Sequence, residues 1–569
     1  MTHLKPILYI LVVPLSLAAA DAFWYSSLSS RVGRGTQLTL PYNYTENFLS
    51  GIYQNGPWYV NMRIELSPEP EYGHKMMGLE NAFMRYSHNM FSLEFGHITA
   101  LFGSGIGLNL YKDQSIDFDN QVLGMRVEST LGKQLQFDFV AGVKENYEFY
   151  ASGSDLRLPN GQLDYGLLGA ALSFNTEHGV RNSTPYLILS QTVADYAAYE
   201  LNNNSGTIEQ DTLRQIQNAV QAGWFQSVYG ETWGFNIEYT HTWRAFDFPL
   251  LSQSISQSSS ETLLFNKDAV YESQGKSLDL QLDWFPNWAV LSFDYRLYLN
   301  GIEAPEDKRD PLLMASKPLP WQLGPTGLRQ HDISLLANVT HAVDYGDELG
   351  WSFEARPNLT DLWSLALSAA QVSQAVDVRD IDAQPGFIPS LDVAKNPWQE
   401  YYLELEYAGN ELSQRMLIAY TRSTLSGTNA AEITSHYTFM PAYLYWYYRP
   451  DLVFSTVIEL QHSEVNGITY EQEKFEGHAY NSYHFLESID FLGKYSVSLI
   501  WDASNDPNIT SGQGNWEHWI SGDISLKPLE GLWLRAAYGR EKGGIRCTGG
   551  VCRIINPFEG LRFTLEWRL

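Results

Sequence analysis

The chain has 569 residues, a formal net charge of -28 at pH 7 and only two cysteines. Such a negative balance argues against nucleic acid as a partner, because the phosphate backbone would be repelled. Mean hydropathy is slightly negative at -0.25, as in a soluble protein. Aromatic residues, however, make up 14% of the chain, which fits rings of aromatic side chains at two membrane interfaces.

The N-terminus has the composition of a secretory signal peptide. Lys5 supplies a positive charge, residues 6–17 are apolar, and Ala18, Ala19, Ala20 and Ala22 supply small residues for cleavage. The alternative, a membrane anchor, would need about 20 apolar residues, and this run has about a dozen. We therefore predict a signal peptide over residues 1–22 and an exported domain over residues 23–569.

Beyond residue 22 the chain shows one recurring pattern, in which apolar and polar residues alternate with the period of a β-strand. The last nine residues, 561–569, place Leu561, Phe563, Leu565 and Trp567 on one face and Arg562 among the polar residues on the other. A strand that crosses a bilayer at a tilt needs about 9–11 residues. The same alternation occurs in residues 58–66, 91–96, 123–128, 135–144, 233–244, 278–284, 291–300, 401–407, 452–461, 495–502 and 532–539.

The connections between these segments fall into two length classes. Short turns, such as residues 408–411 and 528–531, alternate with long polar loops at 145–163, 245–275, 300–328 and 373–397. Outer-membrane barrels have short periplasmic turns and long extracellular loops. A soluble sandwich gives no reason for this segregation, and a propeller would repeat every 40–50 residues or so, a period that is not found.

These patterns predict an all-β, transmembrane antiparallel β-barrel of the bacterial outer membrane, in contact with outer-membrane lipid. At about 22–25 residues per strand the barrel would have about 22 strands, with an even number between 18 and 24. Strand direction does not alternate cleanly between Gly301 and Ser373, so a strand is missing or misplaced there. Residues 208–222 read equally well as a short loop helix and as a flexible polar loop.

The two cysteines, Cys547 and Cys552, flank a Gly-Gly pair in the last long loop. In an exported protein this spacing predicts a disulfide that closes the turn. A metal site would need two more ligands, and a redox pair has two intervening residues rather than four. We predict no cofactor and no metal site.

A glycine-rich loop at residues 101–113 is the second unusual connection. It lacks the spacing of a phosphate-binding loop, and no helix follows it. Glycine in a barrel more often marks a bend, a bulge or a loop that folds back against the wall. We therefore hypothesise a constriction of the lumen formed by Phe102, Gly103, Gly105, Gly107, Tyr111 and Asp113.

The polar faces of the predicted strands carry charges of both signs. A mixed, wet wall of this kind is expected for a passive channel or a plugged conduit, and its selectivity would be weak unless a constriction focuses the field. The residues predicted to face the lumen are Arg63, Glu65, Glu94, Arg126, Glu128, Asp138, Glu238, Arg244, Asp294, Arg296, Arg535 and Arg562.

Three sets of motifs resemble an uncharacterised, Bacteroidota-type family of outer-membrane barrels, a domain of unknown function. The loop 547–553, with its Cys-Thr-Gly-Gly-Val-Cys-Arg run, is similar to the ending of that family. Residues 102–113, 117–120 and 124–127 resemble its N-terminal signature, and residues 330–335 resemble its middle. The resemblance implies a signal peptide and a barrel inserted by the barrel-assembly machinery, with no established activity. This chain ends in Leu569, where barrels commonly end in an aromatic residue, and its ring is at Trp567.

For function, the sequence favours a porin-like channel or passive transporter for small polar solutes. The alternative is a structural barrel whose lumen is plugged or filled by an unknown protein partner, as in a secretion or electron-transfer assembly. An enzyme is not expected, since no nucleophile elbow is present and His241 and His436 are isolated. The permeant solute, the partner and the oligomeric state do not follow from the sequence.

Overall fold

The protein is described by a computed structural model. It covers residues 23–37, 40–71, 75–113, 118–149, 161–176, 181–202, 207–247, 250–257, 260–266, 270–300, 319–326, 335, 341, 343–376, 385–392, 395–409, 412–426, 432–449, 451–468, 474–507, 515–548, 551–555 and 557–568. The predicted signal peptide, residues 1–22, lies outside these ranges. None of the helices in the described ranges has the length and apolar character needed to cross a membrane.

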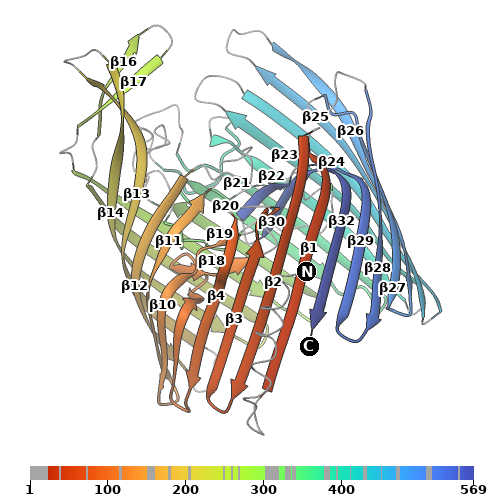
Figure 1. Ribbon diagram of the computed structural model, residues 1–569, viewed down its shortest axis with the longest axis horizontal. Coiled ribbons are helices and arrows are strands. Elements are labelled where there is room, and N and C mark those ends of the chain that lie inside the picture. Colours follow the sequence, from red (N-terminus) through yellow and green to blue (C-terminus); the bar gives the residue numbers. More distant parts are fainter. Residues whose placement is uncertain are drawn as a thin grey trace, which may run out of the picture.

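The main element is a closed sheet of 24 antiparallel strands (Figure 1). Consecutive wall strands pair with each other, as expected for an up-and-down barrel. In order around the wall they are β1 (Phe23–Gln37), β2 (Leu40–Asn55), β3 (Trp58–Ser67), β4 (Met76–Ser87), β5 (Phe91–Ile98), β10 (Val122–Leu131), β11 (Leu135–Phe149), β12 (Gly161–Asn175), β13 (Arg181–Asn202), β14 (Thr207–Tyr229), β15 (Trp233–Asp247), β18 (Val270–Trp284), β19 (Ala289–Leu299), β20 (Glu348–Pro357), β21 (Trp363–Ser373), β22 (Trp398–Ala408), β23 (Leu412–Ser426), β24 (Glu432–Arg449), β25 (Leu452–Ile468), β26 (Lys474–Phe491), β27 (Tyr495–Ser504), β28 (Glu517–Leu529), β29 (Leu532–Glu541) and β32 (Phe558–Arg568).

The barrel closes where β1 meets β32, with Ser27 opposite Arg568 and Thr36 opposite Glu559. Figure 1 shows the two strands side by side, red next to dark blue. An even strand number lets this closing pair be antiparallel like all the others. The predicted fold class is therefore confirmed, and the count of 24 lies at the upper limit of the expected range.

Among the described residues, four two-stranded hairpins lie outside the 24-stranded sheet, all in connections of the long class. The β5–β10 connection holds two of them, and the β15–β18 and β29–β32 connections hold one each. They are β6 (Ala100–Phe102) with β7 (Leu108–Leu110), β8 (Lys112–Asp113) with β9 (Phe118–Asp119), β16 (Leu250–Gln257) with β17 (Ser260–Asn266), and β30 (Gly544–Thr548) with β31 (Val551–Ile555).

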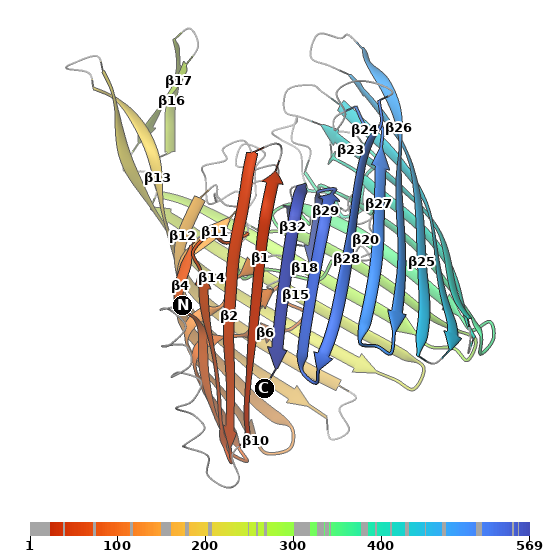
Figure 2. The ribbon, with the colours of Figure 1, turned by 45° about the vertical axis from the view of Figure 1, so that its right-hand side comes forward.

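The outer face of the wall carries an apolar band. On β32, Leu561, Phe563 and Trp567 are exposed, whereas Arg562 on the opposite face pairs with acidic side chains. Aromatic side chains gather near the short turns, as in the girdles of membrane barrels. Examples are the contacting pairs Trp58–Tyr86, Trp363–Tyr407 and Trp446–Phe454. The end of the barrel with the short turns, at the bottom of Figure 2, is called the short-turn end below.

Two expectations about local structure need correction. Residues 208–222 form neither a helix nor a loop but part of β14, a strand of 23 residues that pairs with β13 over its whole length. The polar side chains of this stretch obscured its alternation. Figure 2 shows the β13–β14 hairpin projecting past the neighbouring strands, at the end opposite to the short turns. Between Gly301 and Ser373 the missing strands are β20 and β21, which follow one long connection from β19.

The cysteine loop forms the β30–β31 hairpin, in which Cys547 is opposite Cys552. Directly opposed residues of an antiparallel pair have Cα atoms about 4.5–5.5 Å apart, within the range that a disulfide spans. The backbone register is therefore compatible with the predicted disulfide.

We expect the protein isolated from an oxidising compartment to contain no free thiol. Alkylation of the denatured protein with maleimide–polyethylene glycol should cause no shift on a non-reducing gel and a shift of two adducts after reduction. A Cys552→Ser variant serves as the control and should react once without reduction. Two adducts on the unreduced wild-type protein would show that the cysteines are not paired.

Candidate functional site

The glycine-rich loop of the sequence leaves the wall between β5 and β10, and its described residues, 99–113 and 118–121, lie inside the barrel. Its β6–β7 hairpin places Phe102, Leu108 and Leu110 in a buried apolar cluster with residues of the inner wall, among them Tyr165 and Ile188. Because alternate residues of these short strands are apolar, the hairpin covers the wall as a second layer. We call residues 99–113 and 118–121 the first inner segment.

Hydrogen bonds to Glu238 on β15 hold the turn of this segment against the wall. The backbone N–H and the hydroxyl of Ser104 both donate to Oε2 of Glu238, and the hydroxyl of Tyr186 on β13 donates to Oε1. The Ser104 hydroxyl lies 2.6 Å from the carboxylate oxygen. Since Glu238 is fully buried, these donors replace the water that its carboxylate would otherwise bind.

Two glycines are needed for this close approach. A Cβ atom on Gly103, which has φ of +64°, would lie 2.4 Å from the Glu238 carboxylate, and one on Gly107 would lie 2.5 Å from the ring of Tyr186. Neither neighbour has room for a larger residue, so only glycine permits the contact.

The remaining residues of the predicted constriction lie in the same segment. Gly105 has φ of +109° and faces the carbonyl oxygen of Leu323. Tyr111 contacts the ring of Phe118 at 5.0 Å between centroids. Burial, and to a smaller extent the Asp113 carboxylate, raises the pKa of Tyr111 to about 12, which keeps its phenol neutral. All six residues named from the sequence are thus brought together on one side of the lumen.

A second inner segment, residues 319–326, lies against the first. The N–H of Asn109 donates to the carbonyl of Trp321 at 2.9 Å, and its side-chain amide donates to the carbonyl of Leu323 at 3.0 Å. Asn120 donates to the carbonyl of Pro320 at 3.0 Å. The prediction of an extracellular loop over residues 300–328 is therefore wrong for these residues. Their apolar composition, which includes a fully buried Trp321, was the available signal that they are covered.

The β19–β20 connection, which contains the second inner segment, also contacts a different sector of the wall. The N–H of Leu335 donates to Glu459 on β25 at 2.8 Å, and its side chain packs with Tyr402 and Tyr443 on β22 and β24. Tyr345 donates to the carbonyl of Gly324 at 3.1 Å. One connection therefore contacts the wall at β22–β25 as well as the layer beside β15 and β19.

Most of the charged residues predicted for the lumen form ion pairs. Arg126 contacts Asp138 at 2.6 Å and Glu128 at 2.7 Å, and Arg296 contacts Glu348 at 3.0 Å. Elsewhere the pairs are Arg63–Glu80 at 2.8 Å, Arg85–Glu94, Arg535–Asp523 at 3.0 Å, and Arg562 with Glu541 at 2.6 Å and Glu71 at 3.2 Å. Arg244 is buried and donates to the carbonyl of Asn300 at 2.9 Å, and Glu65 is opposite Phe48 on β2.

One sector of the wall has an excess of carboxylates. Glu238 on β15 is directly opposite Asp279 on β18, and Asp279 is opposite Arg296 on β19. Arg296 is already paired with Glu348 on β20. Asp279, Asp294 and Arg296 line a small cavity of about 40 Å³ beneath Pro325 and Thr326 of the second inner segment, enough space for a few water molecules. Among the described residues, no group of three or more His, Cys, Asp or Glu side chains is placed to hold a metal ion.

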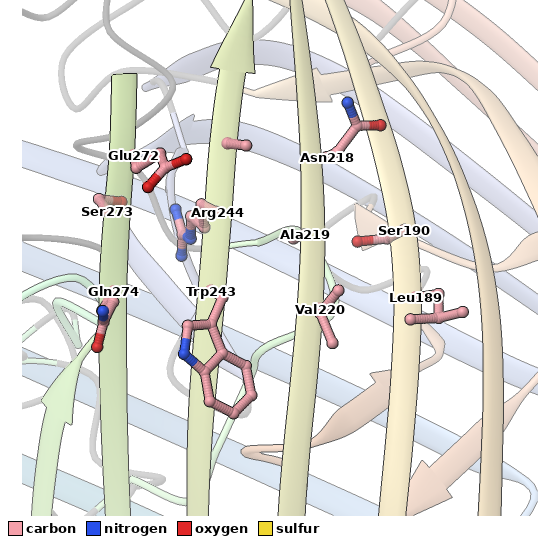
Figure 3. Close-up of a pocket in the computed structure, with 11 residues that line it drawn as sticks. Leu189, Ser190, Asn218, Ala219, Val220, Trp243, Arg244, Glu272, Ser273 and Gln274 are labelled. Atoms are coloured by element: carbon pink, nitrogen blue, oxygen red, sulfur yellow. The ribbon is translucent and has the colours of Figure 1, made fainter. Parts of the chain in front are cut away.

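A larger hollow of about 590 Å³ lies on the outer face of β13, β14, β15 and β18. Figure 3 shows Trp243, Val220 and Leu189 in its lower part and Asn218 and Glu272 above them, toward the long loops. The lining thus changes from apolar to polar along the strands. We interpret this level as the boundary of the apolar band, with Trp243 at the interface.

The fold and the inner segments define a class: a transmembrane β-barrel whose lumen is partly filled by its own connections. Within that class, the chain belongs to the family of unknown function DUF6029, which it matches over residues 42–355 and 489–569. The match includes both inner segments and the cysteine loop. No curated protein matches the chain.

Solved outer-membrane proteins resemble it in fold. The copper transporter OprC is 8% identical, with a TM-score of 0.45, 96% of this chain and 81% of that chain being covered. The siderophore receptor PirA from Acinetobacter baumannii is 7% identical, with a TM-score of 0.45, and the likeness covers 96% of this chain and 80% of that chain. The FrpB iron transporter from Neisseria meningitidis is 8% identical, with a TM-score of 0.44, and the likeness covers 96% of this chain and 82% of that chain. This likeness concerns the barrel architecture alone.

Proposed function

We propose that the protein is a channel of the bacterial outer membrane for small polar solutes, narrowed by its two inner segments. The observation that carries this proposal is the double layer at β12–β19, where the first inner segment and residues 319–326 are fixed to the inner wall by buried hydrogen bonds. Connections anchored in this way form a constriction of defined shape, which is what a selective channel needs.

The chemistry of the wall supports passage of hydrated, polar solutes. Many of the charges predicted for the lumen are paired with a charge of the opposite sign. The carboxylates of Asp279 and Asp294 lie beside Arg296, which is already engaged by Glu348. A local excess of negative charge beside a constriction favours cations over anions.

The test is planar-bilayer conductance of the purified, folded protein in about 1 M salt, the ionic strength at which long-range fields are screened. Discrete steps of conductance are expected, together with swelling of liposomes in small sugars. Protein that is folded, as shown by heat-modifiable migration on a gel, yet conducts no current would contradict the proposal.

Removing the acidic excess should lower cation preference. In a double variant, Asp279→Asn with Asp294→Asn, we expect the reversal potential in a potassium chloride gradient to shift toward zero relative to the wild type. The matched control is Asp361→Asn with Glu530→Gln, which removes two charges from exposed positions in short turns. An equal shift in both double variants would assign the preference to overall charge and not to the constriction.

The second candidate is a structural barrel filled by a protein partner. The contact of Leu335 with the β22–β25 sector favours it, because a connection that touches separate sectors of the wall obstructs free passage. Absence of conductance, combined with a specific protein recovered by affinity purification from membranes after crosslinking, would support this function over the channel.

A further inference from the structure

Part of the β21–β22 connection lies on the outer face of the barrel. Leu297, Leu299 and Leu349, three side chains of β19 and β20 that point away from the lumen, are nevertheless buried and cluster with Ala375 of this connection. The N–H of Gly386 donates to the carbonyl of Ala375 at 2.9 Å, which places residues 385–392 beside this cluster. The opposite faces of these strands carry Arg296 and Glu348, which face the inner segments. The connection therefore covers the side of the wall that faces the membrane.

Polar side chains on the outer face hold this segment. The Tyr295 hydroxyl donates to the carbonyl of Phe387 at 2.8 Å, and the Gln371 amide donates to the carbonyl of Pro389 at 3.1 Å. The Ser373 hydroxyl accepts from the N–H of Ser390 at 3.0 Å. Polar residues such as Gln371 and Ser373 are unfavourable on the lipid-facing side of a strand. Here both form hydrogen bonds with the backbone of residues 389 and 390.

The segment turns its apolar side chains outward. Ile388 is 79% exposed, Phe387 71% and Leu391 54%. Among the large apolar side chains of the described residues, Ile388 is the most exposed. Two adjacent large hydrophobic groups held away from the wall by a fixed backbone need an apolar environment around them.

The position of the segment along the barrel axis indicates that this environment is the membrane. Tyr295 to Leu299 follow Ala289, the first residue of β19 at the short-turn end, by six to ten positions. A tilted strand crosses the hydrocarbon core in about 9–11 residues, so the segment lies over the outer part of the apolar band. Irregular backbone is not tolerated deep in hydrocarbon, and here the barrel satisfies the carbonyls of Phe387 and Pro389 while the side chains project.

We propose that residues 386–391 form an interfacial anchor that inserts Phe387 and Ile388 among the acyl chains of the outer leaflet. The anchor fixes the level of the barrel in the bilayer on the β19–β21 side. It lies in residues 356–488, between the two regions that the family match covers. This inference is independent of whether the lumen conducts.

The test places single nitroxide labels on the full-length protein in liposomes. Phe387→Cys and Ile388→Cys are compared with Leu499→Cys, on the outer face in the apolar band, and Asp361→Cys, in an exposed short turn. The unsubstituted protein, taken through the same labelling, controls for Cys547 and Cys552. Heat-modifiable migration confirms that each variant is folded.

We expect labels at 387 and 388 to collide with oxygen more than with a water-soluble nickel chelate, as at 499 and opposite to 361. Preferential collision with the chelate would overturn the proposal by placing the segment in water. Labels that are immobilised and shielded from both reagents would also overturn it, since a protein surface would then cover the segment.

Discussion

Deleting residues 104–109 should raise the single-channel conductance severalfold. The deletion removes Ser104, whose N–H and hydroxyl bind Glu238, and Asn109, which joins the first inner segment to Trp321 and Leu323. Without these contacts the β6–β7 hairpin loses its attachment and the inner layer opens into the lumen. The measurement is the step size in planar bilayers, with sugar cut-off in liposome swelling as a second readout.

The matched control removes the same number of residues from the tip of the β16–β17 hairpin, which is outside the main sheet. Its conductance should equal that of the wild type. If the deletion of 104–109 also leaves the step unchanged in protein shown to be folded, the first inner segment does not limit passage, and the constriction has to be sought around Leu335.

The faces of the strands could be read from the sequence because alternation is a local property. Leu561, Phe563 and Trp567 face outward as their spacing predicts, since a strand that separates lipid from water must segregate its side chains. The same argument failed in residues 208–222, where the β13–β14 hairpin extends past the apolar band and neither face has to be apolar. Alternation therefore identifies only the part of a strand that lies in the membrane.

The position of the long connections could not be predicted in the same way. The glycines at 103, 105 and 107 suggested a close approach to the wall, and the structure shows the partners, Glu238, Tyr186 and Leu323. For residues 319–326 and 385–392 the only signal was apolar character within a polar loop. Whether such a run packs inside or outside the barrel depends on wall residues distant in sequence, such as Gln371 for the outer segment.

The family match separates these elements. Both inner segments fall within residues 42–355, whereas the outer segment falls between the two matched regions. The proposed lipid contact of residues 386–391 lies on the outer face, whereas the inner segments lie in the lumen, so the two proposals can be tested separately.

Replacing Arg296 with Met should destabilise the barrel by about 3 kcal/mol, because removing one partner of a buried ion pair leaves an uncompensated charge. The side chains of Arg296 and Glu348 are 3% and 2% exposed. Without Arg296, the Glu348 carboxylate keeps only the ring of His341 at 2.7 Å and the N–H of Asp344 at 2.9 Å. The measurement is urea unfolding in detergent, followed by tryptophan fluorescence.

A second substitution makes the cause of this loss identifiable. In Arg296→Met with Glu348→Gln both charges are gone, so most of the lost stability should return, and the coupling of the two changes measures the pair. The control is Arg356→Met in the exposed pair with Glu354, where side chains are 57% and 27% exposed and the expected cost is below about 1 kcal/mol. Equal losses of stability at Arg296 and Arg356, or no recovery in the double variant, would show that the long side chain of Arg296 stabilises this sector by packing and not by its charge. The proposed excess of negative charge at Asp279 and Asp294 would then lack its electrostatic basis.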